Sequence, residues 1–176
     1  LMSLSGAAGA ITLPHMRYFH RSALLLCLLA VTACGSGGTA TTEVWFLTGS
    51  GSLASEEREI AGGSSADELA AAVAALAAGP QDEGLVAVLP PDTPLSSELS
   101  DGTARVEMGA GFASRVSAAG SAAAIQVVAP IVWTATALDG VEGVLLTEGG
   151  APLELTGSGL VFDDPLTRDD FPGVAG

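Results

Sequence analysis

The sequence predicts an α+β fold in which a single mixed, mostly antiparallel sheet carries two helices packed on one face. Three observations predict it. Short segments rich in β-branched and aromatic residues outnumber helical segments. Two pairs of these segments flank turn sequences typical of antiparallel hairpins, and two longer segments repeat apolar residues at helical spacing. The predicted order is strand, weak strand, helix, two strands, helix, two strands.

The first two predicted strands differ in polarity. Residues 43–48 are aromatic and β-branched and end at the Gly-Ser-Gly segment 49–51, which predicts a strand followed by a turn. Residues 53–60 are apolar at their ends but carry Glu-Glu-Arg-Glu at positions 56–59. Because charged side chains hinder the pairing of a strand with other chains, this pattern predicts an exposed edge strand.

The clearest predicted helix covers residues 65–78. Ser65 and Glu68 have the spacing of a capping box, which satisfies free amides of the first turn, and Gly-Pro at 79–80 ends the run. Four apolar residues recur at helical spacing and predict one buried stripe: Leu69, Ala72, Val73 and Leu76. We expect this stripe to pack against a sheet rather than to bind a partner.

The strongest hairpin pattern is the Asp-Gly pair at 101–102, flanked by residues 95–99 and 104–108. A short apolar stretch at 84–89 precedes it and is ended by the proline-rich segment 90–94, which cannot lie in a central strand. One face of the strand at 104–108 is apolar and the other polar, as expected for a half-buried strand.

The second helix is predicted over residues 121–138, with Pro130 expected to bend it or to reset its first turn. A second hairpin follows, with strands at 141–147 and 153–156, and the tail at 160–171 is expected to dock along the domain as an extended arm. The helix is predicted to bury one stripe made of Ile125, Val128, Val132 and Ala135.

The N-terminal part has the order of a secretory signal. Read from Met16, it has a positive region with Arg17 and Arg21, an apolar run at 23–30, and Val-Thr-Ala-Cys at 31–34. The apolar run is about half as long as a helix that crosses a bilayer, so a permanent span is disfavoured. The small residues before the cysteine resemble the lipobox of bacterial lipoproteins. The resemblance implies cleavage between Ala33 and Cys34 and a diacylglycerol and palmitate anchor at Cys34.

An ordinary signal peptide, with the cysteine there by chance, is the alternative. The flexible Gly- and Thr-rich segment that follows Cys34 favours the lipid anchor, because such a tether lets a domain stand off a surface. The expected segments are a non-native or unstructured extension (1–15) before a true start at Met16, the lipoprotein signal peptide (16–33), the lipid-anchored tether (34–42), the domain (43–158) and a C-terminal tail (159–176).

Charge narrows the function classes. All 20 acidic residues and four of the six basic residues follow Cys34, which gives this part a formal charge of −16, and the sequence contains no lysine. Such a charge repels phosphate backbones and anionic lipid, so nucleic-acid binding is not expected. A membrane contact is expected only through the anchor at Cys34.

The part of the chain after Cys34 is poor in catalytic side chains. Both histidines, His15 and His20, precede the predicted cleavage site, and the other cysteine, Cys27, lies in the apolar leader. A serine without a histidine or lysine to activate it is a weak nucleophile. The sequence therefore predicts a protein that is not an enzyme and has no catalytic residue, metal or cofactor.

At this point the chain resembles the GerMN domain of sporulation and spore-germination proteins and of bacterial envelope lipoproteins. The resemblance covers residues 43–156 and implies an interaction module without assigned catalytic residues. It rests on the order of several segments: Val-Trp-Phe-Leu (44–47), the helix at 69–76 with Gly-Pro (79–80), Leu-Pro-Pro-Asp-Thr-Pro-Leu (89–95), Asp-Gly-Thr-Ala-Arg-Val (101–106), Ile-Val-Trp-Thr-Ala-Thr (131–136), Gly-Val-Glu-Gly-Val (140–144) and the tail at 165–171.

Three function hypotheses follow. The first is a lipid-anchored module on the outer face of the cytoplasmic membrane that binds an envelope protein or a peptidoglycan-associated wall polymer, with strands such as 53–60 accepting a partner strand. The second is a self-assembling structural unit of an envelope complex. The third is a metal-dependent hydrolase, since carboxylate oxygens suit calcium or magnesium, based on Asp163, Asp164, Asp169 and Asp170. The sequence does not indicate the ligand or the oligomeric state.

Overall fold

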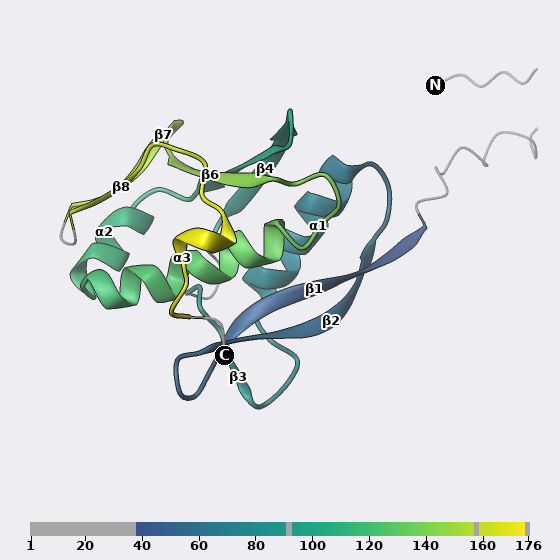
Figure 1. Ribbon diagram of the computed structural model, residues 1–176, viewed down its shortest axis with the longest axis horizontal. Coiled ribbons are helices and arrows are strands. Elements are labelled where there is room, and N and C mark those ends of the chain that lie inside the picture. Colours follow the sequence, from purple (N-terminus) through teal and green to yellow (C-terminus); the bar gives the residue numbers. More distant parts are fainter. Residues whose placement is uncertain (1–37, 91–92, 157–158, 175–176) are drawn as a thin grey trace, which may run out of the picture. The chain divides into compact units, whose positions relative to one another are not determined.

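The computed structural model describes residues 38–90, 93–156 and 159–174, shown in colour in Figure 1. The part of the chain from Gly37 onward forms one compact unit. Its elements are, in order, β1 (Thr39–Thr48), β2 (Leu53–Ala61), α1 (Ser65–Ala78), β3 (Leu85–Val86), β4 (Leu95–Ser100), β5 (Thr103–Met108), α2 (Phe112–Ala118), α3 (Ser121–Ala135), β6 (Gly143–Glu148), β7 (Ala151–Leu155), β8 (Leu160–Phe162) and the 3₁₀ turn η1 (Arg168–Asp170).

The α+β class is confirmed, but the strands form two sheets where the sequence predicted one. One sheet has the order β2-β1-β3 and the other the order β4-β5-β6-β7-β8. The separation follows from the surroundings of β1. β2 pairs along one edge of β1, and the short β3 pairs along part of the other edge. On that second edge, the backbone N–H of Trp45 donates to Oγ1 of Thr134 in α3 at 2.9 Å. Helix α3 therefore contacts β1 where a further strand of a single sheet would have to pair.

The larger sheet is mixed and mostly antiparallel, as predicted. β4 and β5 form the expected hairpin, in which Asp101 and Gly102 both have positive φ (50° and 77°), as a two-residue type I′ turn requires. β5 and β6 pair in parallel, and α2 and α3 form the crossover between them. β6, β7 and β8 then continue antiparallel, with Gly149 and Gly150 in the turn of the second predicted hairpin.

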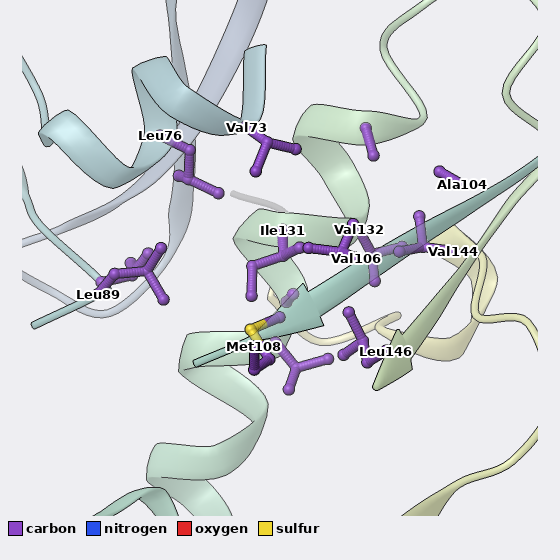
Figure 2. Packing of buried hydrophobic residues seen from close by; sticks show 14 of the residues in the cluster. Val73, Leu76, Leu89, Ala104, Val106, Met108, Ile131, Val132, Val144 and Leu146 are labelled. Atoms are coloured by element: carbon purple, nitrogen blue, oxygen red, sulfur yellow. The ribbon is translucent and has the colours of Figure 1, made fainter. Parts of the chain in front are cut away.

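Both long helices contact strands of both sheets, which explains why the core is continuous. α1 contacts β1, β2 and β4, and α3 contacts β1 and β6. Figure 2 shows side chains of α1, α3, β5 and β6 converging on one another. The labelled residues belong to one buried cluster: Val73, Leu76, Leu89, Ala104, Val106, Met108, Ile131, Val132, Val144 and Leu146.

Helix α1 has the predicted bounds and buries the predicted stripe of Leu69, Ala72, Val73 and Leu76. The cap lies one residue earlier than expected: Ser64, not Ser65, is the N-cap, and Asp67, not Glu68, completes the capping box. The reason is that Ser64 has the extended backbone that an N-cap needs, with φ −73° and ψ 159°, whereas Ser65 is already helical.

The second predicted helix corresponds to α3, which runs through Pro130 and ends three residues before the expected position 138. Val128, Val132 and Ala135 are buried as predicted, but Ile125 is 40% exposed. The buried stripe instead includes Ala124, which precedes Val128 by one helical turn and lies about 100° around the helix from Ile125. The sequence reading missed α2 altogether; this seven-residue helix buries Phe112 and Val116.

Of the two chain segments that flank the expected domain, the N-terminal one contains more regular structure than predicted and the C-terminal one docks as predicted. β1 begins at Thr39, inside the segment 34–42 that was expected to be a flexible tether, because residues 39–42 pair with residues 58–61 of β2. The tail docks as predicted: β8 pairs with β7, Leu166 bridges Val144, and Phe171 is only 5% exposed.

Candidate functional site

The predicted cleavage and lipidation site, Ala33 and Cys34, lies outside the described residues and stays a prediction. Among residues 38–90, 93–156 and 159–174, no helix is both long and apolar enough to span a bilayer. Within the described part of the chain, the candidate binding feature is the outer edge of β2, where the sequence predicted an exposed strand.

The hydrogen bonds between β1 and β2 show which backbone groups of β2 point away from β1. Gly62 N–H donates to Gly38 C=O (2.7 Å) and Thr48 N–H donates to Ser52 C=O (2.8 Å). In an antiparallel ladder such pairs recur at every second residue, so the even-numbered residues of β2 bond to β1. The odd-numbered residues then direct N–H and C=O away from β1, and the N–H of Leu53 does reach another acceptor, Val174 C=O, at 2.7 Å.

From residue 55 to residue 61, this outer side of β2 pairs with no other strand in the described part of the chain. Glu57 and Glu59 are exposed on the same face of the strand, and Glu43 of β1 lies directly opposite Glu57 in the register. We use the name acidic edge for the outward backbone groups of residues 55–61 together with the side chains of Glu43, Glu57 and Glu59.

The acidic edge contains a repulsive cross-strand pair. Like charges directly opposite each other on one face of a hairpin are destabilising. Ser55 Oγ donates to Glu43 at 3.3 Å and gives it one neutral partner. Among the described residues, no arginine forms an ion pair with these carboxylates: Arg58 pairs with Glu56 on the opposite face of β2, and the Arg168 guanidinium packs against the rings of Trp45 and Trp133. The carboxylates of the acidic edge are therefore exposed to solvent and have no ion-pair partner among the described residues.

The opposite face of β2 is fixed to the C-terminal end of α1. Arg58, 8% exposed, forms an ion pair with Glu56 and donates to Gly79 C=O at 2.6 Å. Glu56 also accepts from the backbone N–H groups of Gln81 and Asp82 at 2.9–3.1 Å. Burial by itself would raise the pKa of Glu56, but these N–H groups and Arg58 together hold the pKa below its ordinary value. These contacts attach one face of β2 to the segment that follows α1, while its outer edge pairs with no described strand.

An aromatic cluster fixes β1, α3 and the tail to one another. The rings of Trp45 and Trp133 lie 4.7 Å apart between centroids, and the Arg168 guanidinium lies 4.8 Å from the Trp133 ring and 5.8 Å from that of Trp45. Arg168 also donates to Thr136 Oγ1 (2.9 Å) and Trp133 C=O (3.1 Å). The sequence reading did not predict this cluster; the only pointer was the aromatic and hydroxyl content of residues 131–136.

The carboxylates proposed for a metal-dependent hydrolase do not gather. Asp170 accepts from Thr167 N–H (2.7 Å) in the cap of η1. Asp163, Asp164 and Asp169 are exposed. Among the described residues, no group of three or more His, Cys, Asp or Glu side chains is placed to hold a metal ion.

An apolar groove of about 420 Å³ lies between the segment at 87–90 and helices α2 and α3. Val88, Val116 and Val127 line it, and Arg115 contributes the charged part of its wall. Nothing in the described residues indicates which molecule would occupy it.

Comparisons with known proteins agree with this architecture. The family model named Germane, described as "Sporulation and spore germination", matches residues 43–154. The chain is similar to the first GerMN domain of the sporulation protein GerM from Bacillus subtilis, with 24% identity, a TM-score of 0.62, and coverage of 75% of this chain and 100% of that one. A comparison with curated proteins found no match.

Two further solved structures are similar. The tandem GerMN domains of GerM from Bacillus subtilis match at 19% identity and a TM-score of 0.55, over 76% of this chain and 48% of that one. A candidate lipoprotein from Clostridium perfringens matches at 19% identity and a TM-score of 0.50, over 79% of this chain and 94% of that one. At these identities the structures establish a shared fold. Because the family model spans most of the described domain, the resemblance to GerMN proteins is confirmed and the chain belongs to the Germane family of sporulation and spore germination domains.

Proposed function

We propose that this protein is a lipoprotein anchored through Cys34 to the outer face of the cytoplasmic membrane, whose Germane domain binds an envelope protein without catalysing a reaction. The observation that carries the proposal is the order of positive residues, short apolar run and Thr-Ala-Cys at 32–34. The similarity of fold to a candidate lipoprotein from Clostridium perfringens supports it.

Binding is favoured over catalysis by the hydrogen bonds of three half-buried carboxylates, Glu56, Glu107 and Glu148. A general acid that works near neutral pH needs a raised pKa. The pKa of Glu107 is instead held below its ordinary value, first by the hydrogen bond from Thr147 (2.5 Å) and also by the backbone N–H of Gly150. Glu148 accepts from the backbone N–H groups of Gly111 and Ala113 at the start of α2. These carboxylates, like Glu56, are engaged in hydrogen bonds that support the backbone.

The anchor is tested by Cys34→Ala, with Cys27→Ala as the matched control in the same leader. Cells are fed an alkyne analogue of palmitate, and the protein is isolated from membranes for labelling and mass spectrometry. We expect wild type and Cys27→Ala to carry the label on an N-terminal peptide that begins at Cys34, and Cys34→Ala to be unlabelled. An unmodified first residue elsewhere, or label that persists in Cys34→Ala, would refute the anchor.

The binding function is tested in intact cells. A photo-cross-linking residue is placed at exposed positions of β2, α1 and β7 in turn, and products are identified by mass spectrometry. We expect at least one position to give a discrete cross-linked product with an envelope protein. The product should be absent in the Cys34→Ala variant, because that variant is not retained at the membrane. Absence of a discrete product from every face would contradict a binding module.

A further inference from the structure

We propose that the acidic edge binds a basic polypeptide segment in extended conformation, added beside β2 as a further strand with lysine or arginine at every second position. This inference rests on the proposed binding function and specifies the chemistry of its partner.

The backbone supplies the first part of the recognition. Residues 55–61 present outward N–H and C=O groups at every second residue, and an extended segment can pair with them as strands pair in a sheet. The strand is held in place by the Arg58 contacts to Glu56 and Gly79, so little ordering of β2 is needed on binding. The open stretch is seven residues long and so suits a segment of about seven residues.

The side chains select the charge of that segment. Side chains of an added strand that share the face of Glu57 and Glu59 lie beside these carboxylates and recur at every second position. Opposite charges across strands are favourable, and a cation there also relieves the repulsion between Glu43 and Glu57. A second copy of the same strand would instead bring further carboxylates into the same row. The charge pattern therefore favours a basic partner over edge-to-edge self-association.

The other edge strands lack this combination. On β4, Glu98 lies opposite Arg105 in the register, so its charge already has a partner. β8 covers only Leu160–Phe162, which is too short for a stable added strand. β3 has two residues. Among the described strands, β2 alone combines a long open edge with unneutralised carboxylates.

The test uses the protein purified from its membranes in detergent and a fluorescent nine-residue peptide of alternating lysine and threonine. A peptide of the same sequence with every backbone nitrogen methylated has the same charge but no N–H to donate, so it cannot pair as a strand. Binding is measured by fluorescence anisotropy at about physiological ionic strength, where long-range attraction is screened. The variant Glu57→Gln/Glu59→Gln is compared with Asp139→Asn/Glu154→Gln, which removes the same charge from exposed positions on other elements.

We expect the lysine–threonine peptide to bind and the fully N-methylated peptide not to bind. Glu57→Gln/Glu59→Gln should weaken binding about tenfold, whereas the control variant should bind as wild type. Methylation of the lysine backbone nitrogens alone or of the threonine backbone nitrogens alone then tests which set of N–H groups pairs with β2. Antiparallel addition uses the N–H groups of the lysines and parallel addition those of the threonines, so methylation of one set should abolish binding while methylation of the other is tolerated.

Equal binding of the fully N-methylated peptide, equal weakening by both double variants, or tolerance of both methylated sets would overturn the inference in favour of non-specific attraction by charge. A dimer in analytical ultracentrifugation that Glu57→Gln/Glu59→Gln stabilises would overturn it in favour of self-association. The cross-linking experiment separates the two proposals. If a discrete partner is captured equally by wild type and by Glu57→Gln/Glu59→Gln, the binding function stands and the acidic edge is not its site.

Discussion

Thr134→Val tests how α3 is joined to β1. Thr134 is fully buried, and its Oγ1 accepts the backbone N–H of Trp45 at 2.9 Å. Valine has nearly the same shape as threonine, so the substitution removes the acceptor without creating a cavity. The N–H of Trp45 faces away from β2 in the ladder and loses its acceptor in this partly buried contact.

The cost follows from the orphaned donor. A buried N–H that loses its partner costs about 1–3 kcal/mol, more than the net worth of an average hydrogen bond. For a unit of about 140 residues, each 1 kcal/mol lowers Tm by about 3 °C. We therefore expect Thr134→Val to lower the free energy of unfolding by about 2 kcal/mol and Tm by about 6 °C.

The assay combines urea unfolding with hydrogen exchange at the Trp45 amide. Thr134→Ser retains the hydroxyl and should keep this amide protected, although the lost methyl group costs about 1 kcal/mol. Thr41→Val makes the same chemical change at an exposed position of β1 and should change stability by less than about 0.5 kcal/mol. Unchanged Tm and unchanged protection of Trp45 in Thr134→Val would refute the role assigned to this contact.

Two other perturbations follow from the structure. Because the pKa of Glu56 is lower in the folded state, its stabilising contribution is present above about pH 4.3, its unfolded pKa, and is lost as pH falls through the folded pKa. Glu56→Gln should thus be less stable than wild type at pH 7, with a difference that shrinks by pH 3 in urea unfolding; a difference independent of pH would contradict this. Phe171 lies outside the family match at 43–154 yet is buried, so Phe171→Ala should cost about 3–5 kcal/mol, whereas Val161→Ala at an exposed site of the same tail should cost little. Equal thermal stability of these two variants would show that the tail does not contribute to the fold.

Sequence patterns predicted correctly the elements whose formation depends on residues close together in the chain. The bounds of α1 follow from a polar cap, a stripe at helical spacing and a terminal Gly-Pro, all within 17 residues of one another (64–80). The Asp-Gly turn at 101–102 follows from the positive φ that a tight hairpin demands. The short α2 was missed because its seven residues, set between Gly111 and Gly120, are too few for a helical period to emerge. Ile125 was wrongly predicted to be buried, because periodicity indicates a stripe of apolar residues but not which residues at its sides are covered by neighbouring elements.

The candidate site was predictable in outline only. The charges at 56–59 indicated an exposed edge, and that edge is confirmed. The different roles of those charged residues depend on which face of β2 each side chain occupies and on contacts with residues far away in the sequence. Arg58 and Glu56 meet residues 79–82 on one face, while Glu57 and Glu59 face solvent on the other.

The amino-acid sequence by itself determined the α+β class, the helix at 65–78, both hairpins, the open edge strand and the poverty in acid-base groups after Cys34. These features depend on short-range periodicity, turn conformation and composition, which are properties of neighbouring residues. Only the tertiary structure decided that the strands divide into two sheets, that α2 and α3 connect β5 to a parallel β6, and that the tail closes over Trp45 and Trp133. Each of these depends on contacts between residues far apart in the chain, and local patterns do not specify which distant surface a buried stripe or a cation will meet.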